Sequence, residues 1–189
     1  MGFLEEVRTI TFPQGVYDRV LAHARRKLRG DYEPGEEAAK KSYGLLGGRM
    51  HDHEIVATHA FALRRNLRWS APLRPYVDEV MEAVAVPSET PFERRGWVAD
   101  PNEVQAAEET CDAAGSILFG SYHMHRVAWA SDPVRDTCTK LDRRLAEGSG
   151  LWCLILSMVD PERPVLRAFY EARNEREALV RTTTAVESP

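Results

Sequence analysis

The chain has 189 residues, of which 43% are hydrophobic and 29% are charged. This composition is typical of a globular domain and unlike that of a disordered or membrane-spanning chain. The length fits one domain with some decoration. A formal net charge of −4 and a pI near 5.9 give no general attraction for phosphate backbones. We therefore expect no nucleic-acid partner, and a fold that forms alone or as a homo-oligomer.

The cysteines and the first residues bear on location. Cys111, Cys138 and Cys153 are an odd number and lack the paired spacings of a disulfide framework or a zinc knuckle, which indicates a reducing compartment. The chain does not begin with a basic segment followed by a long apolar one, and no run approaches the ~18 apolar residues that cross a bilayer. We expect a cytoplasmic protein with no membrane partner.

The first elements follow from hydrophobic periodicity. Alternating β-branched residues predict a strand at 7–12, and apolar residues at helical spacing predict a helix at 14–28 that ends at Gly30. Two apolar, β-prone segments at 42–48 and 55–63 flank a polar turn, so they predict a hairpin.

Residues 64–95 differ in character because they mix Arg, Pro and Ser, and they are interpreted as an insertion with one amphipathic segment at 75–84. A short strand at 97–99 then precedes a helix at 102–114. Asp100 and Pro101 open this helix, with the proline at the first helical position. The remaining predictions are a strand at 116–125, a helix at 134–147, strands at 151–158 and 165–170, and a charged helical extension with a loose tail in 173–189. We expect one domain over 1–175 and a tail over 176–189.

The candidate site begins with two histidines. His123 and His125 are two residues apart on a predicted strand, so both imidazoles project from one face. Zinc favours imidazole nitrogen and carboxylate oxygen, and a catalytic zinc keeps three protein ligands. Asp136, 11 residues after His125 at the predicted start of a helix, is the expected third ligand, and Asp132 is its competitor.

The same segment carries a family resemblance. In the MPN/JAMM metalloprotease family, two histidines with one residue between them are followed by a serine and, three residues later, by an aspartate. The chain resembles this family over roughly residues 7–172, through the segments Gly44–Gly48, Asp100–Glu103, Gly120–His125 and Ile155–Ser157. The resemblance implies an α/β (α+β) fold, with a mixed, curved β-sheet flanked by helices and a cytidine-deaminase-like core, and it implies that His123, His125 and Asp136 bind Zn²⁺.

Three family positions are occupied by unexpected residues, and one of them is Arg126, which stands where the family has a proline after its second histidine. Lys41 stands where the family has its general-base glutamate, and Pro133 stands where it has the serine that stabilises the tetrahedral intermediate. Loss of a proton shuttle alone can reduce a rate by about 10²–10⁴. Glu37 and Ser131 are the nearest substitutes. Lys41 itself is interpreted as a surface lysine beside a strand, because a cation at the site would disfavour metal binding.

Two further candidates have ordinary structural interpretations. His51 and His53 form a second pair with one residue between them, but they fall in the predicted hairpin turn, where polar residues are expected at the surface. Cys138 is two residues from Asp136, an offset that points to another helix face, so it is interpreted as a small buried hydrophobe.

The resemblance implies a zinc-dependent hydrolase that cleaves a peptide or isopeptide bond. The expected partner is a protein or peptide, such as the tail of a ubiquitin-like or sulfur-carrier-like protein, and the insertion is where it would be gripped. A non-catalytic MPN-like scaffold with a structural metal is the alternative, which the missing glutamate favours. A 2-His-1-carboxylate iron oxygenase has suitable ligands, but the resemblance does not support it.

Overall fold

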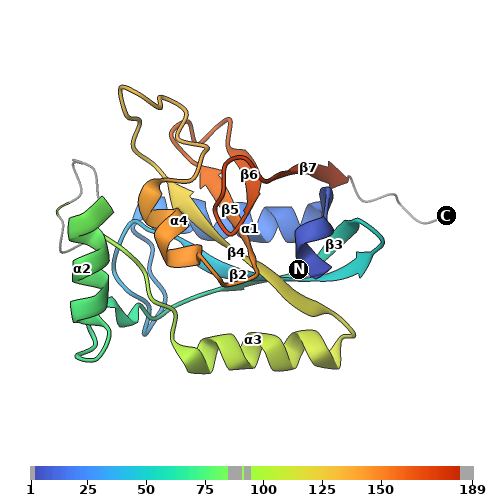
Figure 1. Ribbon diagram of the computed structural model, residues 1–189, viewed down its shortest axis with the longest axis horizontal. Coiled ribbons are helices and arrows are strands. Elements are labelled where there is room, and N and C mark those ends of the chain that lie inside the picture. The colour runs from blue at the N-terminus through green and yellow to red at the C-terminus, as the bar shows by residue number, and fades with distance from the viewer. Residues whose placement is uncertain (1–2, 85–90, 92–94, 184–189) are drawn as a thin grey trace.

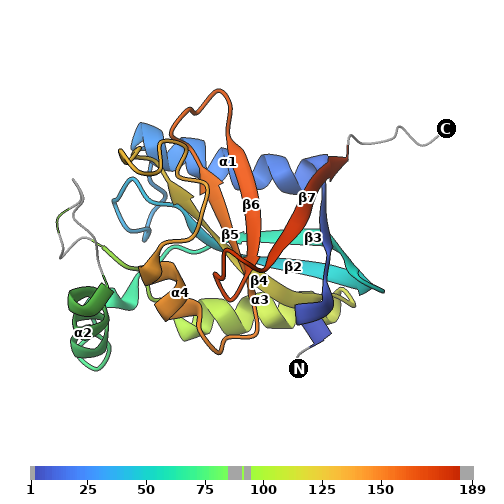
Figure 2. The same cartoon turned by 45° about the horizontal axis from the view of Figure 1, so that its top comes forward.

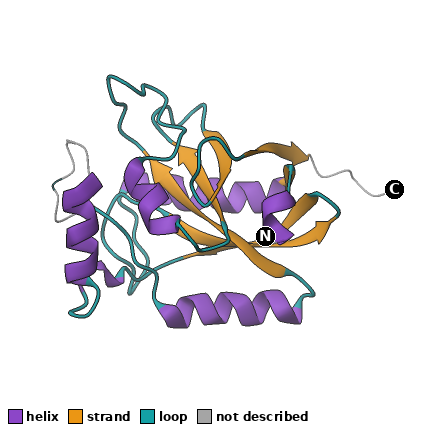
Figure 3. Cartoon of the chain, in the orientation of Figure 1, coloured by secondary structure: helices purple, strands orange, loops and turns teal. Residues whose placement is uncertain are grey.

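The computed structural model describes residues 3–84, 91 and 95–183, and these residues form both strands and helices (Figures 1 and 3). The strands are β1 (Thr9–Pro13), β2 (Tyr43–His51), β3 (Glu54–Ala62), β4 (Ile117–His125), β5 (Trp152–Ser157), β6 (Val165–Tyr170) and β7 (Glu177–Thr183). The α-helices are α1 (Gln14–Arg29), α2 (Arg74–Val84), α3 (Pro101–Ala113) and α4 (Lys140–Ala146), with 3₁₀ turns η1 (Phe3–Glu6) and η2 (Leu67–Trp69).

The strands form one closed barrel in the order β1-β3-β2-β4-β5-β6-β7. The pairs β2·β3, β2·β4, β5·β6 and β6·β7 are antiparallel, whereas β4·β5 is parallel. Closure comes from β1, which pairs in parallel with β3 on one side and with β7 on the other. Each strand edge is therefore covered by a neighbour, which removes the unpaired edges of an open sheet.

This barrel corrects the expected fold. An MPN/JAMM-like curved α/β sheet flanked by helices was expected, and that expectation is wrong because the structure is a closed, mixed barrel of seven strands with four α-helices in its described part. The helical extension expected beyond residue 173 is also wrong, since 177–183 form β7. In that strand Ala178 is buried, while Glu177 and Leu179 on either side of it are exposed, the period-two pattern of a half-buried strand.

Two helices lie on opposite sides of the strands (Figure 2). The buried face of α1 contributes Val16, Val20 and Ala24 to the main core, together with barrel residues such as Phe12 and Ile55. On the other side, α3 packs against β2 and β4 in a separate apolar cluster. Each fully buried aliphatic side chain contributes about 1.5–3 kcal/mol of transfer free energy, so these two faces fix the barrel between them.

Most of the other predicted elements are confirmed within a few residues. Differences occur where local signals were short. α4 begins at Lys140, so residues 134–139 are loop rather than helix, and 97–99 make only an isolated bridge between Asn66 and Ala99. In the insertion, the amphipathic segment forms α2, but residues 85–90 and 92–94 lie outside the described part, as does the end of the expected tail, 184–189. None of the helices in the described ranges has the length and apolar character to cross a bilayer.

Candidate metal centre

The two histidines stand at the carboxyl end of β4, side by side as the strand period requires. His123 and His125 are 6% and 8% exposed, and their Nε2 atoms are 3.1 Å apart. β2 supplies the wall behind them, because Tyr43 pairs with His123 across the sheet and its ring stacks between His123 and Trp97. This stack holds the first imidazole in one orientation.

The third acidic group at this point is Asp142, on the first turn of α4. One carboxylate oxygen lies 3.2 Å from His123 Nε2, and the other lies 3.6 Å from His125 Nε2. The three side chains form a group whose candidate ligand atoms all lie within 4.8 Å of one another. For zinc bonds of about 2.0–2.1 Å, a tetrahedron places its ligand atoms about 3.3 Å apart, so the donor set fits this ion.

A helix cap positions the carboxylate of Asp142. Thr139 is the N-cap of α4, and the backbone N–H of Asp142 donates to its Oγ1 at 3.2 Å. In return, the backbone N–H and the hydroxyl of Thr139 both donate to Asp142 Oδ2 at 2.7 Å. This reciprocal arrangement is a capping box. It turns the carboxylate back towards the end of β4 and orients it there.

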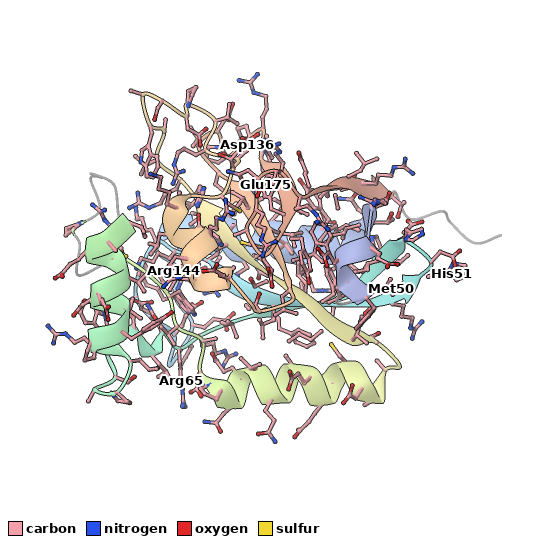
Figure 4. The ribbon with its side chains drawn as sticks, in the orientation of Figure 1. Met50, His51, Arg65, Asp136, Arg144 and Glu175 are labelled. Carbon is pink, nitrogen blue, oxygen red and sulfur yellow. The ribbon has the colours of Figure 1, made fainter. Side chains whose placement is uncertain are left out.

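Asp136, the expected ligand, is directed elsewhere. Its carboxylate forms an ion pair of 3.2 Å with Arg167, a residue of β6, in a loop above the strands (Figure 4). The competitor Asp132 is occupied as well, since it accepts hydrogen bonds from the backbone of Arg135 and the hydroxyl of Thr137. Neither residue is brought to the histidines, and Asp142 takes the place assigned to Asp136.

The ring nitrogens of the histidines have the partners that ligands need. His125 donates from Nδ1 to the backbone carbonyl of Arg135 at 3.0 Å, which leaves the Nε2 lone pair directed at the centre. Metal-binding histidines are usually held in this way by a second hydrogen bond. The Nδ1 atom of His123 faces Cys153 Sγ at 4.0 Å, a long contact that leaves Tyr43 as the main support of that ring.

The centre favours a positive charge. Burial opposes protonation of His123, but the neighbouring Asp142 carboxylate outweighs it and raises the pKa of His123 to about 10. Burial would also raise the pKa of Asp142, yet the two imidazoles hold it well below its usual range. For His125, burial prevails and lowers the pKa. A largely buried carboxylate, 14% exposed, that lies beside two imidazoles thus attracts a cation, whether a proton or a metal ion.

A cavity of about 1060 Å³ opens over the three side chains. Its wall includes the loop before β2, part of the insertion, and the segment between β4 and α4. Of the five buried side-chain N or O atoms that lack a hydrogen-bond partner in the described ranges, four belong to residues that line it: Glu37 Oε2, Ser42 Oγ, Trp97 Nε1 and Arg135 Nε. Unsatisfied buried polar atoms are rare in folded proteins, so their concentration here indicates a binding site.

The two expected substitutes lie in different surroundings. Glu37 lines the cavity, while Ser131 is exposed and is not among the residues that line it. Pro133, at the formal serine position, is exposed as well. Lys41 is half-buried and also lines the cavity, so it is not the plain surface lysine of the sequence interpretation.

The interpretation of the other candidates is confirmed. His51 lies on the hairpin between β2 and β3, at the far end of the molecule from α2, with its side chain 89% exposed (Figure 4). Cys138 is buried, and all three cysteines are free. Sequence reasoning missed Asp142, although Thr139-x-x-Asp142 is a capping-box pattern and keeps the three-residue spacing that the resemblance placed at Pro133 and Asp136.

Comparison with known proteins identifies the fold alone. No protein-family model matches the chain, and no curated protein matches it. The solution structure of protein DSY2949 from Desulfitobacterium hafniense is similar over 94% of this chain and 95% of its own, with a TM-score of 0.61 and 23% sequence identity. A protein from Salinibacter ruber aligns over 95% of this chain and 94% of its own, with 19% sequence identity and a TM-score of 0.47. Neither comparison links the chain to the MPN/JAMM family.

Proposed function

We propose that the protein is a zinc-dependent hydrolase of peptide or isopeptide bonds, in which His123, His125 and Asp142 hold the ion. The observation that carries the proposal is the donor set on the wall of the cavity. Two imidazole nitrogens and one carboxylate lie 3.1–3.6 Å from one another, and each is oriented by a further contact. Three protein ligands beside an open cavity are the arrangement of a catalytic zinc rather than of a closed structural one.

The residues of the chain divide the work. A zinc ion at such a site polarises a carbonyl group and lowers the pKa of water towards about 7. Thr139 fixes the carboxylate of Asp142, and the carbonyl of Arg135 fixes the tautomer of His125. Glu37 is the candidate proton acceptor, because its buried Oε2 has no hydrogen-bond partner and the residue lines the cavity.

Buried charges hold the segment that carries Glu37. Its backbone N–H donates to the carbonyl of Arg64 at 2.9 Å, and its own carbonyl accepts from Lys27 Nζ at 2.7 Å. The adjacent Glu36 carboxylate is fully buried and accepts two hydrogen bonds from Arg26, at 2.6 and 2.9 Å. These bonds fasten the loop before β2 to the end of α1, which supports a fixed position for Glu37.

The cavity suits an extended chain as substrate. Trp69 and Trp97 from the insertion and its flank, and Trp129 from the other side, contribute aromatic walls. Aromatic surfaces of this kind bind peptide segments by apolar contact. The tail of a ubiquitin-like or sulfur-carrier-like protein is the substrate we propose, in the cytoplasm, where the three free thiols would stay reduced.

Metal analysis tests the centre, and hydrolysis tests the activity. The protein is purified without chelator, its zinc and iron are measured, and it is incubated with fusions in which a small ubiquitin-like domain is joined to a reporter through its tail. We expect zinc in a ratio near one and cleavage of the fusion. Glu37→Gln should keep the zinc and lower kcat by about 10²–10⁴.

Glu33→Gln is the matched control, because Glu33 lies on the same loop, is exposed, and forms ion pairs with Arg26 and Arg64. It should cleave like the wild type. Zinc-loaded wild type that cleaves no fusion contradicts the hydrolase and favours a non-catalytic binding module. Iron in place of zinc would instead support a 2-His-1-carboxylate oxygenase. Full activity in Glu37→Gln would remove Glu37 from the mechanism.

A further inference from the structure

The cavity has a charge opposite to that of the whole chain. The chain carries a formal net charge of −4. The carboxylates on the cavity wall are Glu37 and Asp142, whereas the basic residues on it are Lys40, Lys41, Arg95, Arg126, Arg135 and Lys140. A cavity lined mainly by one sign of charge attracts ligands of the other sign. Its ligand is therefore expected to be an anion.

One of these cations is built into the wall rather than displayed at the surface. The side chain of Arg135 is only 9% exposed, and its Nε atom is buried with no hydrogen-bond partner. Its guanidinium carbon lies 3.5 Å from the centre of the Trp129 ring, so the group is supported from one side by an aromatic face. The other cations of the cavity lack this combination of burial, stacking and an unused donor in the described structure.

The local backbone is also specialised. Arg135 has a φ of 55°, in the left-handed region that residues other than glycine seldom adopt. Such strain persists when the surroundings determine the conformation, and it is common at binding sites. The conformation is maintained by Asp132, which accepts from the backbone N–H of Arg135 at 2.8 Å. It lets the carbonyl of Arg135 reach His125 while the side chain stacks on Trp129.

The ion pair with Asp132 leaves the Nε donor of the Arg135 guanidinium without a hydrogen-bond partner. Their ion pair is 3.7 Å long, and the carboxylate of Asp132 is shared with the backbone of Arg135 and with Thr137. A guanidinium can make two parallel hydrogen bonds to a planar carboxylate. A buried guanidinium with an unpaired Nε and one weak ion pair is therefore prepared for a second anion.

We propose that Arg135, stacked on Trp129, binds a carboxylate group of the substrate within the cavity that His125 lines. That the bound molecule is a substrate rests on the proposed function. The proposal narrows this substrate to an acyl chain or peptide that presents a carboxylate beside the bond to be cleaved. The binding itself requires no metal.

A binding experiment tests the clamp without using activity. N-acetylglycine and its uncharged analogue N-acetylglycinamide are titrated into metal-free and zinc-loaded protein, and binding is followed by NMR on the signals of the two small molecules, which can be read in every variant. In metal-free wild type we expect the carboxylate to bind at least about tenfold more tightly than the amide. Arg135→Met should abolish this preference, and Arg135→Lys should retain only part of it, because lysine lacks the planar fork.

Arg126→Met is the matched control, since Arg126 is an exposed cation on the same cavity. It should keep the preference. Circular dichroism and zinc content show whether Arg135→Met is folded. If Arg135→Met does not fold, Trp129→Leu replaces it in the test. Trp129→Leu removes only the stacking face and should weaken carboxylate binding. Equal binding of both probes by metal-free wild type, or an unchanged preference in Arg135→Lys and Trp129→Leu, would overturn the proposal. A preference without cleavage of a fusion that carries an aspartate beside the scissile bond would support the clamp while contradicting the hydrolase.

Discussion

Replacement of Asp142 by asparagine separates the proposed ligand from the residue that simple spacing suggested. Asparagine keeps the shape of the side chain and one acceptor oxygen, so the bond from the Thr139 backbone, 2.7 Å in the wild type, can persist and the helix cap with it. The negative charge 3.2 Å from His123 Nε2 is lost. Loss of a supporting residue outside the ligand set alone costs about 10–100-fold in metal affinity. We expect zinc affinity to fall by more than about 100-fold.

Thermal unfolding converts this loss into a temperature. Zinc at 100 times its Kd stabilises the wild type by about 2.7 kcal/mol. For a chain of 189 residues, each kcal/mol raises Tm by about 2–4 °C, so zinc should raise it by about 5–11 °C. At the same zinc concentration, a 100-fold weaker site contributes about 0.4 kcal/mol, or about 1 °C. Circular dichroism melts with and without zinc measure both shifts.

Asp136→Asn is the control for this experiment. Asp136 is engaged by Arg167 at 3.2 Å in a partly exposed ion pair, which is worth at most about 1 kcal/mol. The variant should lose a little stability and keep the full zinc-induced rise in Tm. The reasoning is refuted if Asp142→Asn keeps the wild-type rise, or if Asp136→Asn loses it.

Three more predictions concern the supports of the site and of the barrel. Thr139→Ala should lower stability by about 1 kcal/mol and zinc affinity by about 10–100-fold, measured by denaturation and zinc titration. Thr139→Ser, which keeps the hydroxyl, should have the stability and the zinc affinity of the wild type. Burial lowers the pKa of His23 from 6.5 to about 4, because the buried ring is more stable uncharged. The stability that the uncharged ring contributes is present in full above pH 6.5 and is lost as the pH falls towards 4. The total loss is about 3 kcal/mol. Urea denaturation at pH 7.5 and pH 4 should show the loss, and equal stabilities would contradict it. Ala178→Asp places a carboxylate at a 1% exposed position where β7 closes the barrel, and should cost more than about 3 kcal/mol, whereas the exposed Leu179→Asp should cost little.

The sequence could predict local elements because their signals are local. The apolar spacing after Val16 and the glycine at position 30 delimit α1, and the alternation in β4 places His123 and His125 on one face. Barrel closure could not be predicted in this way. It depends on the pairing of β1 with β7 from opposite parts of the chain, and β7 has only one buried residue, Ala178, to indicate a strand.

The aspartate that lies beside the two histidines was missed for a related reason. A fixed distance of 11 residues from His125 led to Asp136, but the loop after β4 is longer than that spacing assumes and continues to residue 139. The position of Asp142 is set by a helix start, which the pair Thr139 and Asp142 indicates more reliably than a distance does. Glu37 was named from the sequence as a substitute acid, but its place on the cavity wall depends on packing between α1 and the loop before β2, which no pattern in the sequence predicts.

The parallel pairing of β1 with β7 also affects how the protein is made. More than 160 residues separate the two strands. At about 5–20 residues per second, a ribosome needs on the order of 10–30 s to add them. During that interval β1 and β6 each present an unpaired edge to other chains, a surface that promotes aggregation. Nascent chains should therefore depend on chaperones until β7 emerges, and conditions that slow translation near the end of the gene should lower the yield of folded protein.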